Sequence, residues 1–196
     1  MLLSRDFKEF QIRVMGSVIT RNRISIANMV LIAGNGRNVG KTTLACKIIS
    51  HLSQKHQVTG VKISPHFHSY IGGNIRIETE SFIIFDERRH TTKDSSLMLQ
   101  AGAKKVYFIM VKQEALEDAL NALFPFLADG PVVCESGGLH EFADPGLFFF
   151  VNTRDREIEK PQLLRYNPIR VENDGRTFSL NIEKLNFSEN LIFYNE

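Results

Sequence analysis

Gly34-Asn35-Gly36-Arg37-Asn38-Val39-Gly40-Lys41-Thr42-Thr43 joins an apolar run at 29–33 to a helical pattern at 44–49. The order strand, glycine-rich loop, Lys-Thr and helix is typical of a phosphate-binding loop. Glycines let several backbone N–H groups converge on one anion, and the following helix points its partial positive end at that anion. We therefore expect Lys41 beside the outer phosphates of a nucleoside triphosphate, and the Thr42 hydroxyl as a ligand of Mg²⁺.

The loop departs from the common pattern at one position. The pattern has Gly five residues before Gly40, where this chain has Asn35 between Gly34 and Gly36. Asn enters positive φ more readily than most residues, so we expect Asn35 to permit the same curl. The alternative is an ordinary strand–turn–helix connection that contains Gly-Lys-Thr.

The composition excludes several classes of protein. The 196 residues carry 24 Lys and Arg against 22 Asp and Glu, a net charge of +2, which does not indicate a nucleic-acid surface. No run reaches the roughly 18 apolar residues of a membrane span, and the charged start does not look like a secretory signal. Two cysteines form no disulfide framework. We expect a cytoplasmic protein that binds neither nucleic acid nor membrane.

Strand and helix patterns alternate along the middle of the chain. Strands are expected at 28–34, 57–63, 105–111, 131–134 and 147–151, helices at 40–55, 94–103 and 113–128, and either a hairpin or two short strands over 75–85. This alternation predicts an α/β fold with a mainly parallel sheet and helices on both faces. Together with the phosphate-binding loop pattern, we expect the three-layer P-loop NTPase arrangement.

The two ends of the chain show other patterns. Leu3, Phe7, Phe10, Val14 and Val18 recur at helical spacing, so we expect an amphipathic helix within an N-terminal extension, 1–27. The Asp-Gly pair within 169–178 predicts a β-hairpin on the edge of the sheet. The expected organisation is this extension, a core at 28–160, and an appendage at 161–196 packed on the core.

Polar residues at strand ends supply the other candidates. Lys62, Asp86, Glu135 and Asn152 each lie at or just after the end of an expected strand, and ligands of open α/β sheets bind at the carboxyl ends of strands. Glu135 could face a nucleotide-bound Mg²⁺ or be a solvated loop carboxylate. Asp94 could be a second metal carboxylate or the N-cap of a helix.

Asn152 and Asp155 have the spacing of the guanine-reading Asn-Lys-x-Asp box, without its Lys. A turn at the end of a strand explains the pair equally well. We therefore expect a nucleotide site made of Gly34, Asn35, Gly36, Arg37, Asn38, Val39, Gly40, Lys41, Thr42, Thr43 and Asn152.

The loop resembles that of dethiobiotin synthetases and cobyrinic acid amide synthases, in which Gly and five residues ending in Val precede Gly-Lys-Thr. Glu135-Ser136-Gly137-Gly138-Leu139 is similar to their Glu-Gly-x-Gly-Gly segment, one residue shorter. Lys62 matches their substrate-binding Lys. The resemblance covers roughly residues 28–152.

A second resemblance is to the molybdopterin-guanine dinucleotide biosynthesis protein B family, which binds GTP. Lys93-Asp94-Ser95 and Ala101-Gly102-Ala103 are similar to its Gly-Lys-Asp-Ser and Ala-Gly-Ala signatures, with Thr92 in place of the Gly. Both families place an Asp where Asp94 stands. The resemblance therefore implies that Thr42, Asp94 and Glu135 hold Mg²⁺, that Lys41 and Lys62 are catalytic, and that the protein is a homodimer.

Together these features predict a Mg-dependent protein that binds ATP or GTP, as a slow NTPase or an NTP-dependent enzyme or accessory protein of cofactor biosynthesis. A small molecule or a protein would be its further partner. The alternative is a nucleotide-responsive partner-binding module with negligible turnover. A third, weaker possibility is a small-molecule kinase, for which Arg88, Arg89, Arg154 and Arg156 could form a lid.

Overall fold

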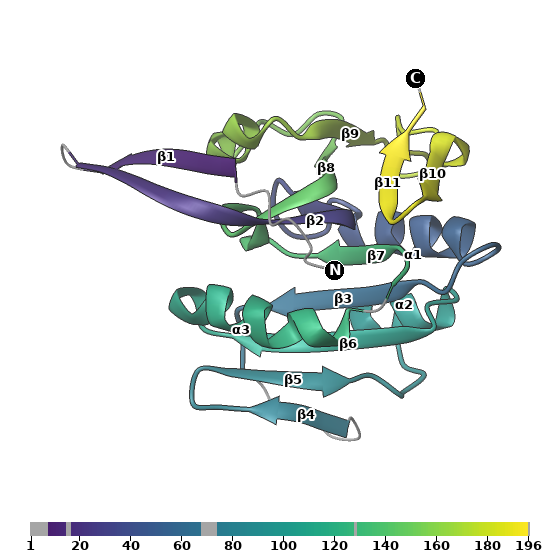
Figure 1. Cartoon of the computed structure of the whole chain (residues 1–196). Helices are drawn as coiled ribbons and strands as arrows, with labels where there is room; N and C mark the ends of the chain where they lie inside the picture. Colours follow the sequence, from purple (N-terminus) through teal and green to yellow (C-terminus); the bar gives the residue numbers. More distant parts are fainter. Residues whose placement is uncertain (1–7, 15–16, 68–73, 128, 196) are drawn as a thin grey trace.

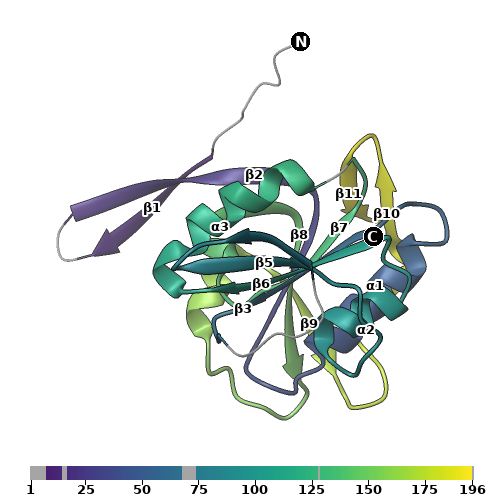
Figure 2. The same cartoon turned by 90° about the horizontal axis from the view of Figure 1, so that it is seen from below.

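The computed structural model describes residues 8–14, 17–67, 74–127 and 129–195. A single large sheet runs through the molecule in the order β4-β5-β6-β3-β7-β2-β8-β9, and β1 pairs with β2 beyond this path (Figures 1 and 2). The strands that carry the candidate site, β2, β3, β7 and β8, are mutually parallel. Their carboxyl ends therefore meet at one edge of the sheet.

The strands have these bounds: β1 Lys8–Val14, β2 Ser17–Gly34, β3 Thr59–Ser64, β4 Asn74–Glu78, β5 Phe82–Asp86, β6 Lys105–Val111, β7 Val132–Glu135, β8 Ala143–Thr153, β9 Ile169–Asn173, β10 Leu185–Ser188 and β11 Leu191–Tyr194. The α-helices are α1 Lys41–Leu52, α2 Asp94–Gln100 and α3 Leu116–Leu123, and short 3₁₀ turns flank or connect several elements.

The central strand β2 is buried on both sides. Met29, Leu31 and Ala33 pack into a core with α3, whereas Val30 and Ile32 pack into a second core with α1 and α2. Figure 2 shows α3 on one side of the sheet and α1 with α2 on the other. The expected α/β architecture, with a mainly parallel sheet and helices on both faces, is thus confirmed. The continuous apolar run at 29–33 suits a strand that is covered on both faces.

The three helices are shorter than the ranges expected from the sequence. In α1 the buried residues Leu44, Ala45, Ile48, Ile49 and Leu52 form one stripe. The pattern at 113–128 yields a helix only over Leu116–Leu123, with 3₁₀ turns before and after it. Pro125 lies in the second of these turns, where it ends the helix because it lacks an N–H donor.

The helix expected within 1–27 is wrong for the described part of that segment. Residues 8–14 and 17–27 are strand, with Lys8 opposite Arg23 and Val14 opposite Ser17 in an antiparallel ribbon. The ribbon extends away from the body in both views (Figures 1 and 2). Phe10, Ile12 and Val14 alternate with polar residues, and this period of two favours a strand. Because β2 continues to Gly34, no boundary separates this segment from the core.

The C-terminal segment contains a hairpin, but its residues are not those expected. Within 169–178, β9 is the edge strand of the sheet and pairs in parallel with β8. After β9 the chain turns back and makes a single antiparallel bridge, between Asn173 and Phe178. The hairpin is instead β10 with β11. Its buried Leu185 and Ile192 join the core on the α1 side of the sheet. The segment expected as an appendage thus supplies a strand of the sheet and part of a core.

Candidate functional site

The loop between β2 and α1 is tightly curled. Gly36, Asn38 and Gly40 have φ of 132°, 60° and 97°. Gly40 is also the N-cap of α1. The loop curls with Asn35 in place, as expected, but the non-glycine residue with a positive φ is Asn38 and not Asn35. Asn35 still continues the sheet, because its N–H donates to the Val151 carbonyl at 3.0 Å.

Asn35 instead fastens the loop to the segment after β8. Its buried amide nitrogen donates to Asn152 Oδ1 at 2.9 Å and to the Glu157 carbonyl at 2.6 Å. Its amide oxygen accepts from the N–H groups of Glu159 at 2.7 Å and Lys160 at 3.2 Å. Glycine could make none of these bonds, so the departure from the common pattern has a structural role.

Asn152, expected to contact nucleotide, lies beside the loop with both polar atoms engaged. Its oxygen accepts from Asn35, and its nitrogen donates to the Arg156 carbonyl at 2.7 Å. The Arg156 guanidinium in turn donates to the Arg37 carbonyl at 3.3 Å. The structure therefore gives Asn152 the role of a connector, which agrees with the strand-end turn more than with a base-reading side chain.

The loop presents backbone donors at the start of α1. Among the described residues, none accepts a hydrogen bond from the backbone N–H groups of 36–43. The first N–H groups of any α-helix lack acceptors within the helix. In this protein the unpaired N–H groups of the curled loop lie next to the unpaired N–H groups at the start of α1. Unpaired donors of this kind, with the helix dipole behind them, can bind an anion where they converge.

Lys41 crosses this loop from the first residue of α1. Its Nζ donates to the Gly36 carbonyl at 2.5 Å, so the ammonium lies over the donor-rich turn. Burial lowers the pKa of Lys41 below its ordinary value, and the nearby charge of Glu135 opposes that effect. A half-buried cation next to unpaired N–H groups favours an anion at this loop, and the carboxylates of Glu135 and Asp94 act against it from the same end of the sheet.

The strand pleat brings Glu135 and Lys62 together. Val61 and Ile63 face the α3 side, so Lys62 faces α1, and the alternation of β7 directs Glu135 to the same face as Val133. The Glu135 side chain is only 3% exposed. Its Oε1 lies 2.5 Å from Lys62 Nζ, and its Oε2 accepts from Thr42 Oγ1 at 2.8 Å.

Asp94 completes this cluster from the first residue of α2. Its Oδ2 lies 2.7 Å from Lys62 Nζ, and the side chain is 46% exposed. The N-cap of α2 is Lys93, so the N-cap alternative for Asp94 is wrong. Burial acts to lower the pKa of Lys62, but the charges and hydrogen bonds of Glu135 and Asp94 outweigh it and raise that pKa.

The oxygens of this cluster are of the chemical type that Mg²⁺ binds, and in this structure Lys62 Nζ contacts one oxygen of each carboxylate. The Thr42 hydroxyl and the carboxylates of Glu135 and Asp94 are hard ligands of the kind that Mg²⁺ takes sparingly while it keeps water and phosphate ligands. Among the residues that the structure describes, no three His, Cys, Asp or Glu side chains form a self-sufficient metal site. A cation here would thus depend on ligands from a nucleotide and water.

Asp86, expected at this edge, lies elsewhere. The strand β5 runs antiparallel to β6, with Asp86 opposite Tyr107, so its carboxyl end points toward the amino ends of the parallel strands. Asp86 Oδ2 instead pairs with Arg76 at 2.8 Å and with Arg88 at 3.4 Å. The rule for strand ends applies only to the parallel strands, and apart from the expected hairpin no local pattern marks this reversal.

Asn173 contacts the loop between β2 and α1, and the sequence did not indicate this contact. Its Nδ2 donates to the Val39 carbonyl at 3.0 Å. A Cβ on Gly40 would lie 2.4 Å from the same nitrogen, so this close approach requires glycine. Asn173 ends β9, which the sequence marked only as one arm of a turn. The C-terminal segment therefore supports the loop from outside.

Comparison with models of protein families, with curated proteins and with solved structures gave no match. Within the described residues, none of the helices combines the length and the apolar character needed to cross a membrane. The function of this chain is therefore inferred from its own geometry.

Proposed function

We propose that this protein binds a nucleoside triphosphate with Mg²⁺ at the edge where β2, β3 and β7 end, and that it hydrolyses or transfers the terminal phosphate slowly. The phosphates would lie on the N–H groups of 36–43, with Lys41 beside the outer ones. The two cysteines of the protein, Cys46 and Cys134, are free thiols, which suits a reducing compartment. We therefore propose a cytoplasmic location.

The residues have separate roles in this proposal. Thr42, Asp94 and Glu135 would hold Mg²⁺ directly or through water, and the ion when bound neutralises phosphate charge. Lys62, fixed by two carboxylates, would supply a cation for the γ-phosphate or an anionic co-substrate. Phosphoryl transfer depends mainly on positioning and charge neutralisation, and these residue types provide both.

One observation supports this proposal more strongly than any other observation. The donor-rich curl at 36–43 and the cluster of Thr42, Lys62, Asp94 and Glu135 share the start of α1, because Thr42 belongs to both and its hydroxyl lies 2.8 Å from Glu135. An anion site and an oxygen-rich cation site in direct contact suit the complex of a polyphosphate with Mg²⁺ better than either ligand alone.

A thermal-shift titration with ATP, GTP and their diphosphates, each with Mg²⁺ or with EDTA, tests the proposal. A ligand that binds only the folded state raises apparent stability by mass action. We expect at least one triphosphate to raise the melting temperature, and more so with Mg²⁺. Failure of all four nucleotides at millimolar concentration would overturn the proposal.

A phosphate-release assay on the nucleotide that binds then tests turnover. Slow release, accelerated by an added small molecule or protein, is the expected result. Tight retention without release under every condition would instead assign a nucleotide-responsive binding role, with no catalysis.

A further inference from the structure

The connection between β5 and α2 contains a buried carboxylate that the candidate site does not use. The Glu87 side chain is fully buried, and Arg89 binds it through Nε and one terminal nitrogen, each at 2.9 Å. The backbone N–H groups of Arg88 and Arg89 also donate to Glu87, at 3.0 and 2.9 Å. A buried carboxylate with so many partners fixes the backbone around it.

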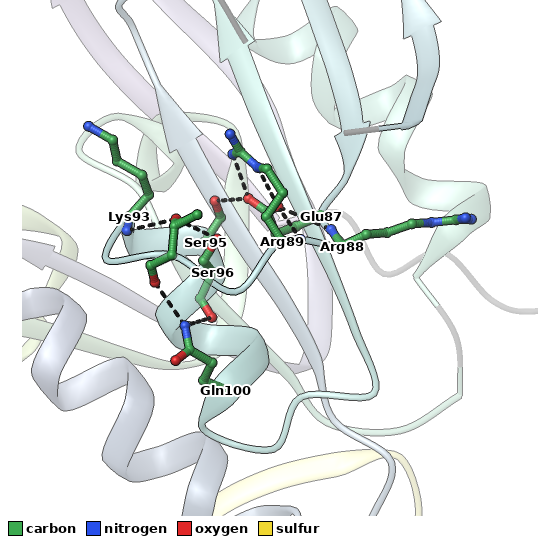
Figure 3. A network of polar contacts seen from close by, with 8 residues as sticks. Glu87, Arg88, Arg89, Lys93, Ser95, Ser96 and Gln100 are labelled. Carbon is green, nitrogen blue, oxygen red and sulfur yellow. Dashed lines mark hydrogen bonds and ion pairs between the residues drawn. The ribbon is translucent and has the colours of Figure 1, made fainter. Parts of the chain in front are cut away.

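Ser95 joins this buried pair to the start of α2 (Figure 3). Its hydroxyl donates to Glu87 Oε2 at 2.6 Å, and Ser95 directly follows Asp94. The N-cap residue Lys93 offers no side-chain cap to the helix. The short helix therefore depends on contacts such as this one for the place at which it begins.

A second set of bonds holds the same turn, and Figure 3 labels Lys93, Ser96 and Gln100 among its members. Thr91 Oγ1 donates to Ser96 Oγ at 3.0 Å and accepts from the Lys93 N–H at 3.2 Å. The Gln100 amide donates to the Thr91 carbonyl at 2.8 Å. These bonds and those of Glu87 together leave the Asp94 backbone little freedom, although its side chain is half exposed.

We propose that Glu87, Arg89 and Ser95 are positioning residues that hold Asp94 at the cation side of the site. This inference rests on the proposed function. Their contacts determine where α2 begins, and this start sets the distance from the Asp94 carboxylate to Lys62 and to the ligands Thr42 and Glu135. Loss of such an outer contact lowers metal affinity by about tenfold or more in metalloproteins.

The experiment compares matched pairs of variants in the 196-residue chain. Ser95→Ala and Arg89→Gln remove contacts to Glu87. Arg88→Gln is the control for Arg89→Gln, because the Arg88 side chain is 63% exposed. Glu80→Gln, a change at an exposed residue, is the control for Glu87→Gln. Calorimetry then gives the affinity of each variant for the nucleotide that binds best, with Mg²⁺ and with EDTA.

We expect Ser95→Ala, Arg89→Gln and Glu87→Gln to bind the nucleotide about tenfold more weakly in the presence of Mg²⁺ and with unchanged affinity in EDTA. The same result is expected of Asp94→Ala. A purely structural role would instead weaken binding equally in both conditions. Ser95→Ala decides the matter if the buried charge variants do not fold. A full Mg²⁺ gain in Ser95→Ala, with a loss in Asp94→Ala, would overturn this inference alone. No binding by the unaltered chain would overturn the proposed function as well.

Discussion

Lys62 and Glu135 occupy paired positions on the neighbouring parallel strands β3 and β7, and their charged atoms lie 2.5 Å apart. The pair is thus built by the register of the sheet and does not depend on a flexible loop. The Glu135 side chain is 3% exposed, whereas the Lys62 side chain is 15% exposed. This geometry fixes one cation at the candidate site and makes its removal costly.

Lys62→Met should lower the free energy of unfolding by about 3–5 kcal/mol, because it leaves the Glu135 carboxylate buried without its cation. Urea unfolding at neutral pH measures this loss. Lys105→Met is the control, since Lys105 is exposed on the adjacent strand β6. Equal stability of the two variants would show that the pair contributes nothing to the fold.

Asn35→Gly restores the common loop pattern but should lower the free energy of unfolding by about 1–3 kcal/mol, because backbone and side-chain partners of Asn35 are left unsatisfied. Asn38→Gly in the same loop should leave stability unchanged or raise it, because Gly adopts positive φ without strain. Chemical unfolding of both variants checks this contrast. A more stable Asn35→Gly protein would refute the fastening role of Asn35.

His140 should make the protein less stable in acid. It is 4% exposed, and burial, with the charges of Arg23, Arg165 and Lys160, lowers its pKa from 6.5 to about 4. Between these values the unfolded chain binds the proton and the folded chain does not, so stability is full above pH 6.5 and falls as the pH drops toward 4.

The variant His140→Phe removes this titration. The unaltered protein should lose about 2–3 kcal/mol more than the variant between pH 6.5 and pH 4, as measured by urea unfolding at each pH. Parallel pH profiles of the two proteins would contradict the assignment of a neutral buried imidazole.

The central part of the fold follows from local sequence. The run at 29–33 is apolar without interruption, as a strand covered on both faces requires, and Gly-Lys-Thr with an apolar stripe marks the helix after it. The rule that ligands gather at the carboxyl ends of parallel strands brought Lys62 and Glu135 to the same edge. Neither inference needs knowledge of distant contacts.

The remaining features depend on contacts that local sequence does not contain. Asn35 is held by residues more than a hundred positions away, so its role could not be seen in the loop alone. Phe10 and Val14 satisfy both a helical and a strand period, and only the pairing of β1 with β2 decides between them. Asp86 was misplaced because the direction of β5 is a property of the whole sheet.

The phosphate-binding role of the loop is tested most directly by a calorimetric titration of Lys41→Ala with the Mg-nucleotide that the unaltered protein prefers. We predict a loss of tenfold or more in affinity, on the order of 1.4 kcal/mol, because the variant removes the cation beside the phosphates. Lys47→Ala, an exposed change on the same helix, should bind as the unaltered protein does. Unchanged affinity in Lys41→Ala would contradict the phosphate-binding role of this loop.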